Sequence, residues 1–405
     1  LKGKNIVLAS TFVTTGDLDL INQTIINGST PVYSDTASCI LIISGESRNC
    51  VIAGFTLTGG KGTKWEDEHN RGYWYTEGGG ILIQNSSPTI RNNVIHDNEA
   101  INKAGAIVSA GGGAIRMGDS NPAILNNYIH HNKGKYGAGI VLNYSGAIIR
   151  NNLITNNSGG QDYGGAGLWI LGNSDDPRLL ENNTIVNNTS FNVGGGVRIW
   201  TSTVVLTNNI IRGNHASQGL QIHGSGTITY CNVEGGKAGE GNIDNPPRFD
   251  NVLFTLPDGA ASIDGGNPHA SFNDTEDPST AGSPLFPSKG TLRNDIGVYG
   301  GPGAQAFPSP DLSDIADIDL NKESLFRIYP NPAKYNIMLE FNNNIKGSAL
   351  MEIINLNGQC VFSKEFEELS NSKGINFHGT DLTAGLYMVK ITTQQLVQTQ
   401  QLVVN

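Results

Sequence analysis

Aromatic and basic side chains recur at two positions of an internal repeat. In each copy a glycine turn is followed by a strand pattern, and both positions point outward from that strand. The first position holds Leu82, Arg116, Val141, Trp169, Arg198 and Gln221. The second holds Gln84, Gly118, Asn143, Leu171, Trp200 and His223. Copies stacked at the roughly 4.8 Å strand spacing would gather one patch of Trp169, Arg198, Trp200 and His223. An indole stacks against a ring and a guanidinium pairs with an anion, so this patch could bind an acidic sugar.

Long insertions precede the same strand in several copies and must emerge on one rim of that sheet. They span residues 61–77, 101–110, 133–136 and 159–163. Loops on a rigid scaffold often carry function, so we expect them to wall a groove. Besides the patch, the expected substrate-binding residues are Trp65, Arg71, Trp74, Lys103, Lys135 and Tyr163. Eight of the 16 Lys and Arg residues in 1–245 lie in these loops or outward columns, which favours an acidic polysaccharide as the partner.

The outward columns contain no Asp or Glu, whereas glycoside hydrolysis needs a pair of carboxylates beside the bond. β-Elimination instead needs a base near the proton alpha to a uronate carboxylate, and cations that neutralise that carboxylate. The sequence therefore favours a polysaccharide lyase. Its candidate bases are Lys64, His69 and Tyr136, and its candidate carboxylate-binding residues are Arg116 and Arg198. Any Ca²⁺ in the groove would use Glu66, Asp67, Glu68 or Asp162.

Two other interpretations stay open. Exposed Trp and Arg side chains can pack against neighbouring loops, and a charged insertion is often only a solvated surface. A non-catalytic surface protein, such as a glycan-binding adhesin or spacer, would also use a long repetitive face. A lyase needs a base, a cation and a stacking ring within reach of one sugar, whereas an adhesin can spread its aromatic residues.

The elements that position these residues come from a repeat over residues 78–243. Each copy has a G-G-G-I-L-I-type run followed by a T-I-R-N-N-V-I-H-D-N-type run. The first residue of each N-N step gives Asn92, Asn126, Asn151, Asn182 and Asn208, and then Cys231, at spacings of 34, 25, 31, 26 and 23. The shortest spacings between copies are 23–26 residues and the longer ones contain insertions, which indicates one solenoid turn per copy. Within a copy the apolar period is two, which predicts short strands that stack in parallel.

Two asparagine columns support a parallel β-helix. The second column is Asn98, Asn132, Asn157, Asn188 and Asn214. Asparagine tolerates the left-handed bend between strands, and stacked amides can hydrogen-bond along a ladder. The repeat resembles that of the right-handed parallel β-helix proteins of the pectate-lyase-like class, clearly over residues 50–243, with residues 1–49 as expected first coils. The resemblance implies the fold but no single activity, because that class holds lyases, hydrolases, epimerases and adhesins.

Residues 244–306 lose the period and gain Pro and Gly, as expected of a cap that covers the last coil. The region is similar to caps that follow β-helix repeats in secreted bacterial proteins. Asp274, Glu276 and Asp277, beside Asn273, are hard oxygen donors that could bind Ca²⁺. The alternative is a solvated acidic turn.

Residues 307–324 read as a linker, and residues 325–405 predict a small antiparallel β-sandwich with N-G as a hairpin signal. This segment resembles the type-A sorting domain of the type IX secretion system, through Y-P-N-P at 329–332, L-N-G at 356–358 and A-G-L-Y-M-V-K at 384–390. The resemblance implies export by that machinery from a Bacteroidetes-type bacterium, to the medium or the outer cell surface. A carbohydrate-binding sandwich is the weaker alternative, because Tyr335, Phe341, Phe362 and Tyr387 alternate as core residues.

Composition agrees with an all-β protein. The chain has 405 residues, of which 52 are Gly, and a net charge of −10. Such a charge without a basic domain gives a phosphate backbone little to bind, so no nucleic-acid partner is expected. No run approaches the roughly 20 apolar residues of a membrane span. The four cysteines have neither zinc-site spacing nor a disulfide pattern.

Overall fold

The computed structural model describes residues 1–309 except 68, 70, 201, 202, 251 and 252. Beyond residue 309 it describes residues 326–329, 333, 336–341, 348–355, 359–366, 375–378, 382, 383, 385–393 and 397–404. The chain forms two compact units, one made of Leu1–Phe249 with Leu253–Ser309, and the other mostly of residues after Ser309. Each unit is described by itself below.

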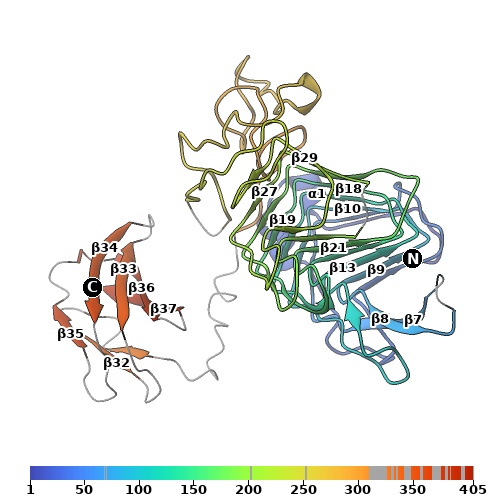
Figure 1. The fold of residues 1–405 in the computed structure, drawn as a ribbon, viewed down its shortest axis with the longest axis horizontal. Coiled ribbons are helices and arrows are strands. Elements are labelled where there is room, and N and C mark those ends of the chain that lie inside the picture. Colours follow the sequence, from blue (N-terminus) through green and yellow to red (C-terminus); the bar gives the residue numbers. More distant parts are fainter. Residues whose placement is uncertain are drawn as a thin grey trace. The chain divides into compact units, whose positions relative to one another are not determined.

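The first unit is a solenoid of four sheets whose strands come from successive coils (Figure 1). Sheet A contains β1 (Val7–Ala9), β5 (Val51–Ala53), β10 (Thr89–Arg91), β14 (Ala123–Leu125), β18 (Ala147–Arg150), β22 (Arg178–Glu181), β26 (Val204–Thr207) and β29 (Thr227–Thr229). Sheet B contains β2 (Ile25–Asn27), β6 (Thr56–Thr58), β11 (Val94–His96), β15 (Tyr128–His130), β19 (Leu153–Thr155), β23 (Thr184–Val186), β27 (Ile210–Arg212) and β30 (Asn232–Val233).

The other two sheets complete each coil. Sheet C contains β3 (Thr36–Ala37), β7 (Gly62–Glu66), β8 (Trp74–Glu77), β12 (Ala110–Gly111), β16 (Lys133–Tyr136), β20 (Ser158–Gly164) and β24 (Thr189–Ser190). Sheet D contains β4 (Ile40–Ile42), β9 (Ile81–Gln84), β13 (Ile115–Gly118), β17 (Ile140–Asn143), β21 (Leu168–Leu171), β25 (Val197–Ile199) and β28 (Ile222–His223). Pairing is parallel throughout, except that β3, β7 and β8 pair antiparallel in sheet C.

The inward residues of the strands stack into one core along the solenoid. In sheet A, Ile90 pairs with Ile124, and in sheet D, Ile115 pairs with Ile140, and all four side chains are fully buried. Like side chains on successive coils pack directly over one another, as the period of two predicts. The predicted all-β parallel β-helix is confirmed.

The asparagine pairs divide two tasks between neighbouring residues. The first residue of each pair, such as Asn151 with φ of 54°, takes the left-handed bend. The second, such as Asn152, donates from Nδ2 to Ile124 O at 2.8 Å and to Asn183 Oδ1 at 3.0 Å, which forms the ladder. Cys231 stands in the ladder column rather than the bend column, because its Sγ accepts from Asn209 N at 3.3 Å and Tyr230 takes the bend.

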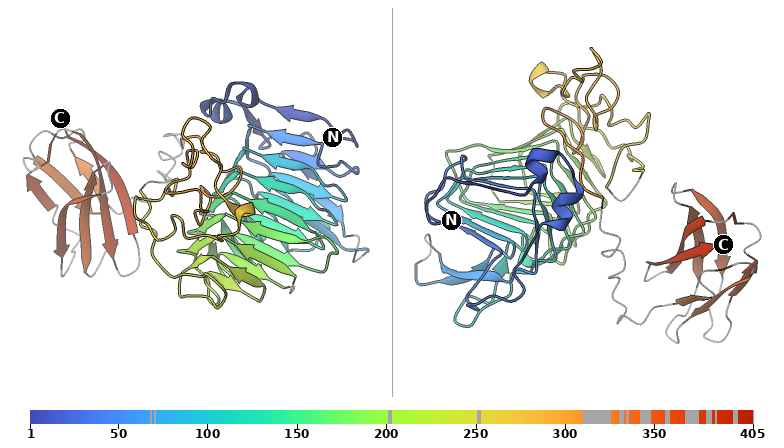
Figure 2. Two further views of the ribbon diagram at one scale, coloured as in Figure 1. Left: turned by 90° about the horizontal axis from the view of Figure 1, so that it is seen from above. Right: turned by 180° about the vertical axis from the view of Figure 1, so that it is seen from behind.

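Residues 234–249 turn over the last coil, whereas residues 253–309, here named the strap, run back along the side of the stack (Figure 2). Asn side chains of the bend column bind the strap coil by coil. The contacts are Asn208 Oδ1 with Asn267 N at 2.8 Å, Asn182 Nδ2 with Asp295 O at 2.8 Å, Asn151 Nδ2 with Val298 O at 2.9 Å, and Asn126 Nδ2 with Gly303 O at 3.0 Å. Only an end cap was expected from the sequence in this region.

The strap reaches the first coil, where the helices α1 (Phe12–Thr15) and α2 (Asp19–Gln23) lie. Asn22 Nδ2 donates to Ser309 O at 2.8 Å, and Phe307, which is 6% exposed, packs with Phe12 and Tyr128. The strap's own short helix is η1 (Ala270–Phe272). Residues 307–309 therefore belong to the solenoid rather than to the linker, and residues 310–324 of the expected linker lie outside the described part of the chain.

The second unit is an antiparallel β-sandwich, as predicted. One sheet has the order β31 (Phe326–Tyr329), β32 (Asn336–Phe341), β35 (Ile375–His378), and the other β34 (Cys360–Phe366), β33 (Ala349–Asn355), β36 (Gly385–Thr393), β37 (Val397–Val404). Its core includes Met351, Val389 and Tyr387, and Phe362 packs against it. Residues 330–332, 356–358 and 384 of the sorting motifs, and the side chains of Tyr335 and Phe341, lie outside the described residues.

Candidate functional site

The outward columns of sheet D are set by glycines in left-handed conformation. Gly165, Gly194 and Gly219, with φ of 70°, 65° and 57°, each precede an outward residue by four positions. In strand register, Trp169 pairs with Arg198, and Arg198 with His223. His223 therefore belongs to the first column, and the expected place of Gln221 there is wrong. Gln221 is buried instead, and its Oε1 accepts from Asn214 Nδ2 at 2.8 Å at the end of the asparagine ladder.

The hairpin of β7 and β8 lies beside sheet D (Figure 1). It brings a carboxylate to the outward columns. Glu77, which is 3% exposed, lies with Oε2 2.8 Å from Arg116 Nε and accepts from Trp65 Nε1 at 2.7 Å. Tyr136 Oη donates to the other oxygen, Oε1. The Arg116 guanidinium lies 4.0 Å from the Trp65 ring centroid. The arginine expected to bind a substrate carboxylate is thus buried and neutralised by Glu77.

Tyr136 is fully enclosed in this network. Burial, followed by the charge of Glu77, raises the pKa of Tyr136 well above its usual value. A phenol with a raised pKa is harder to deprotonate, so this environment opposes the role of base expected from sequence.

Beside this network lies a cleft of about 380 Å³ between sheet D and the loops. It is lined by Asp67, His69, Tyr75, Glu77, Tyr136, Asn143, Tyr144, Tyr163, Trp169, Leu171 and Trp200. The rings of Tyr163 and Trp200 are 6.3 Å apart, and those of Trp169 and Trp200 are 6.2 Å apart. Trp200 is 50% exposed and Tyr163 42%, whereas Trp169 is 5% exposed. Six residues expected from sequence meet here: Asp67, His69, Tyr136, Tyr163, Trp169 and Trp200.

His69 enters the cleft from the hairpin. Its Nε2 lies 2.7 Å from Asp119 Oδ1, and its ring stacks on Tyr144 with centroids 3.9 Å apart. Asp119 Oδ2 also accepts from Gln84 Nε2 at 3.0 Å, which fixes the carboxylate. A histidine held by a carboxylate beside a cleft is a common general-base arrangement.

Arg198 and His223 adjoin the cleft without lining it. The Arg198 guanidinium lies 4.7 Å from the Trp200 ring centroid, and its Nη1 contacts His223 Nδ1. Burial, and then the charge of Arg198, lowers the pKa of His223. Within the described residues no carboxylate lies at ion-pair distance from Arg198.

The remaining expected basic residues do not line the cleft, and two of them bind loops. Lys64 Nζ donates to Ala104 O at 2.7 Å and lies 5.6 Å from the Trp74 ring, and Lys135 Nζ donates to Val108 O at 2.8 Å. Arg71 is exposed in the turn of the hairpin, and burial lowers the pKa of half-buried Lys103. None of these side chains is among the lining residues.

The expected Ca²⁺ ligands of the strap have separate partners. Asp274 Oδ1 accepts from Gly301 N at 2.5 Å, Glu276 Oε1 from Gly282 N at 2.7 Å, and Asp277 Oδ1 from Ser279 N at 2.8 Å. Over the described residues, no group of three or more His, Cys, Asp or Glu side chains is placed to bind a metal ion. Calcium at this turn stays a prediction.

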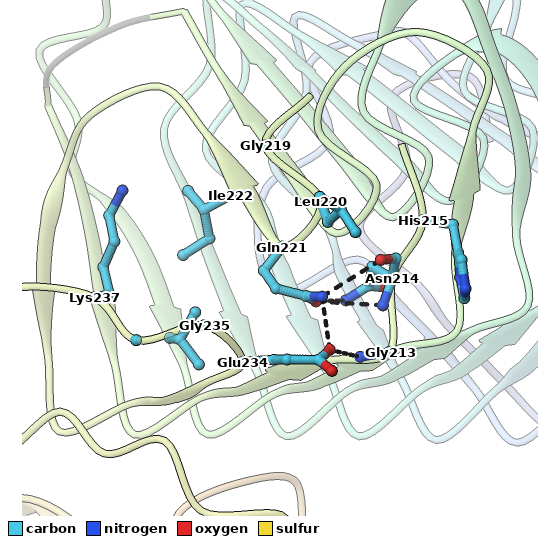
Figure 3. Close-up of a pocket in the computed structure, with 12 residues that line it drawn as sticks. Gly213, Asn214, His215, Gly219, Leu220, Gln221, Ile222, Glu234, Gly235 and Lys237 are labelled. Carbon is cyan, nitrogen blue, oxygen red and sulfur yellow. Dashed lines mark hydrogen bonds between the residues drawn. The ribbon is translucent and has the colours of Figure 1, made fainter. Parts of the chain in front are cut away.

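A second cavity, of about 430 Å³, lies at the last coil (Figure 3). Glu234 Oε2 accepts there from Gly213 N at 2.7 Å and from Gln221 Nε2 at 2.8 Å, so its polar groups bind one another. It contains no residue of the expected site.

Glu77, Asn143 and Tyr144 line the cleft and Asp119 holds His69, yet none of the four was expected there from the sequence. Asn143 stands in an outward column, and Asp119 and Tyr144 take the left-handed bend one residue beyond the second column, with φ of 46° and 48°. That position was a usable signal. Glu77 is the last residue of the insertion 61–77. Its position beside Arg116 depends on how the hairpin of β7 and β8 folds.

Comparison with known families agrees with this architecture. Residues 12–184 match the model of the right-handed β-helix region, and residues 327–405 match that of the secretion system C-terminal sorting domain. No curated protein matches the chain. The protein is thus a right-handed parallel β-helix followed by a sorting domain. The sorting domain marks it as a cargo of the type IX secretion system, released or held at the cell surface. None of the described helices has the length and apolar character needed to cross a membrane.

Proposed function

We propose that the β-helix binds a polysaccharide in the cleft beside sheet D. The observation that supports this proposal is the cluster of aromatic rings around a cavity of about 380 Å³. Tyr163 and Trp200 are half-exposed and belong to different coils of a rigid stack. Exposed rings held at fixed spacing bind sugar faces at little entropic cost.

Binding is tested on the full chain by affinity electrophoresis against a panel of neutral and acidic polysaccharides. Replacing Trp200 by Ala should weaken binding roughly tenfold, because one stacked ring contributes about 1–1.5 kcal/mol. Tyr33→Ala is the matched control, since Tyr33 is an exposed aromatic residue at 73% that does not line the cleft. Equal loss in both variants, or no binding to any polymer, would contradict the proposal.

A second candidate is cleavage of an acidic chain by β-elimination, with His69 as the base. It is favoured by the 2.7 Å contact between Asp119 and the lining residue His69, and by Arg198 beside Trp200 as a cation for the uronate carboxylate. Ultraviolet absorbance of the unsaturated product should rise with acidic polymers and vanish in His69→Gln. Binding without any such rise leaves the glycan-binding function alone.

A further inference from the structure

Two residues of the cleft lining each carry a buried polar atom that has no hydrogen-bond partner. Trp169 Nε1 and Asn143 Oδ1 are buried, and neither makes a hydrogen bond to a described residue. Both residues line the cleft. A buried polar group without a partner is unfavourable, by about 1–3 kcal/mol, so such groups in an otherwise satisfied protein point to a missing ligand or water.

The two groups lie within reach of one sugar. Trp169 is on β21 and Asn143 on the neighbouring β17, where Asn143 pairs with Leu171 and Val141 with Trp169. Adjacent strands are roughly 4.8 Å apart. The indole N–H only donates and the amide oxygen only accepts. A hydroxyl group does both, whereas a carboxylate only accepts and cannot satisfy Asn143 Oδ1.

Neutral and acidic sugars both carry hydroxyl groups, so the charge of the lining decides between them. Its acidic residues are Asp67 and Glu77, and no Lys or Arg is among the described residues that line it. Arg116 is not a lining residue, and Glu77 offsets its charge in a buried ion pair of 2.8 Å. With Glu77 neutralised, Asp67 remains as a carboxylate in a lining without Lys or Arg, which disfavours a polyanion because like charges repel.

We propose that the cleft selects a neutral sugar chain, and that Trp169 Nε1 and Asn143 Oδ1 bind hydroxyl groups of the ring that stacks beside Tyr163 and Trp200. This inference rests on the proposed glycan binding and names its substrate class. It makes Trp169 and Asn143 specificity-determining residues through their polar atoms, in addition to the packing of the indole.

The test measures binding of the full chain, by titration calorimetry, to neutral polymers (β-glucan, xylan, mannan, galactan) and to polygalacturonate and alginate. Trp169→Phe keeps a ring but removes the N–H, and Asn143→Leu keeps the size but removes the amide. Each should weaken neutral binding roughly tenfold, as expected for one net hydrogen bond. Asn143→Asp keeps an acceptor and should bind neutral chains more tightly than Asn143→Leu.

The possible results distinguish this inference from the proposed glycan binding on which it rests. If Trp169→Phe and Asn143→Leu bind like the natural chain while Trp200→Ala does not, the cleft binds glycan but the hydroxyl contacts are refuted. Binding confined to the anionic polymers overturns the neutral substrate class and favours the β-elimination candidate. No binding to any polymer refutes the proposed function itself. Melting curves identify a variant that fails to fold, and Asn143→Leu then decides, since Asn143 lies outside the buried Tyr136–Val141–Trp169 cluster.

Discussion

At the scale of single residues, the buried network beneath the cleft shows how a site can be built around a neutralised charge. Glu77 joins Trp65, Arg116 and Tyr136, which come from three different strands. Removing one partner of a buried ion pair leaves the other charge without compensation in a poorly hydrated place. The pair therefore holds the hairpin of β7 and β8 against sheet D.

Replacing Glu77 by Gln should accordingly destabilise the solenoid by about 3 kcal/mol. All four tryptophans of the chain lie between residues 65 and 200, so their fluorescence reports unfolding of the solenoid alone. Adding Arg116→Met to Glu77→Gln should recover part of the loss, because the orphan charge is then removed. Asp162→Asn, an exposed change, is the control. An unfolding midpoint for Glu77→Gln equal to that of the natural chain would refute this account.

At the scale of elements, each coil depends on paired asparagines with different roles, one in a left-handed bend and one in a buried hydrogen-bonded ladder. Asn156 is exposed with φ of 54°, whereas Asn157 is fully buried and bonds Asn188 Oδ1 at 3.0 Å and Ile129 O at 3.0 Å. Asn156→Gly should thus leave stability within about 0.5 kcal/mol, because glycine accepts a left-handed bend freely. Asn157→Gly should cost about 2 kcal/mol or more through unsatisfied backbone groups. Chemical denaturation compares them directly, and equal effects would contradict the division of tasks.

The same scale explains what the sequence predicts well. Repeated N-N steps and alternating isoleucines depend only on neighbours one coil away, so the β-helix and its columns follow from pattern, except at the last coil, where Gln221 was misplaced. The terminal sandwich follows from its own alternating strands and N-G signal. Glu77 and the hairpin do not, since a 17-residue insertion at 61–77 has no periodic partner. Arg116 and Trp169 were correctly placed in an outward column, yet both are buried because loops cover that column.

At the scale of the whole solenoid unit, the strap carries two buried carboxyl groups that tie its stability to pH. Burial, followed by the charge of Asp295, raises the pKa of Asp274 to about 8, and burial raises that of Asp295 to about 7. An unfolded carboxyl titrates near about 3.9. From roughly pH 4 to pH 8 the folded state therefore holds protons that the unfolded state has lost, and stability falls as pH rises.

The solenoid should accordingly melt several degrees lower at pH 8.5 than at pH 5, measured by tryptophan fluorescence. Asp274→Asn should reduce this dependence, because the amide keeps an oxygen for Gly301 N and carries no charge at any pH. Glu276→Gln, an exposed change in the same segment, should behave like the natural chain. A melting temperature that rises between these two pH values would refute the assignment.

The strap also fixes how many coils the protein can have. An ordinary solenoid gains or loses a repeat at small cost, since each coil contacts only its neighbours. Here one continuous segment meets Asn208, Asn182, Asn151, Asn126 and Asn92 in turn before it ends beside Asn22. A duplicated or deleted coil would shift every later contact out of phase with the strap. The length of the strap therefore matches the number of coils. A change in repeat number would need a matching change in the length of the strap.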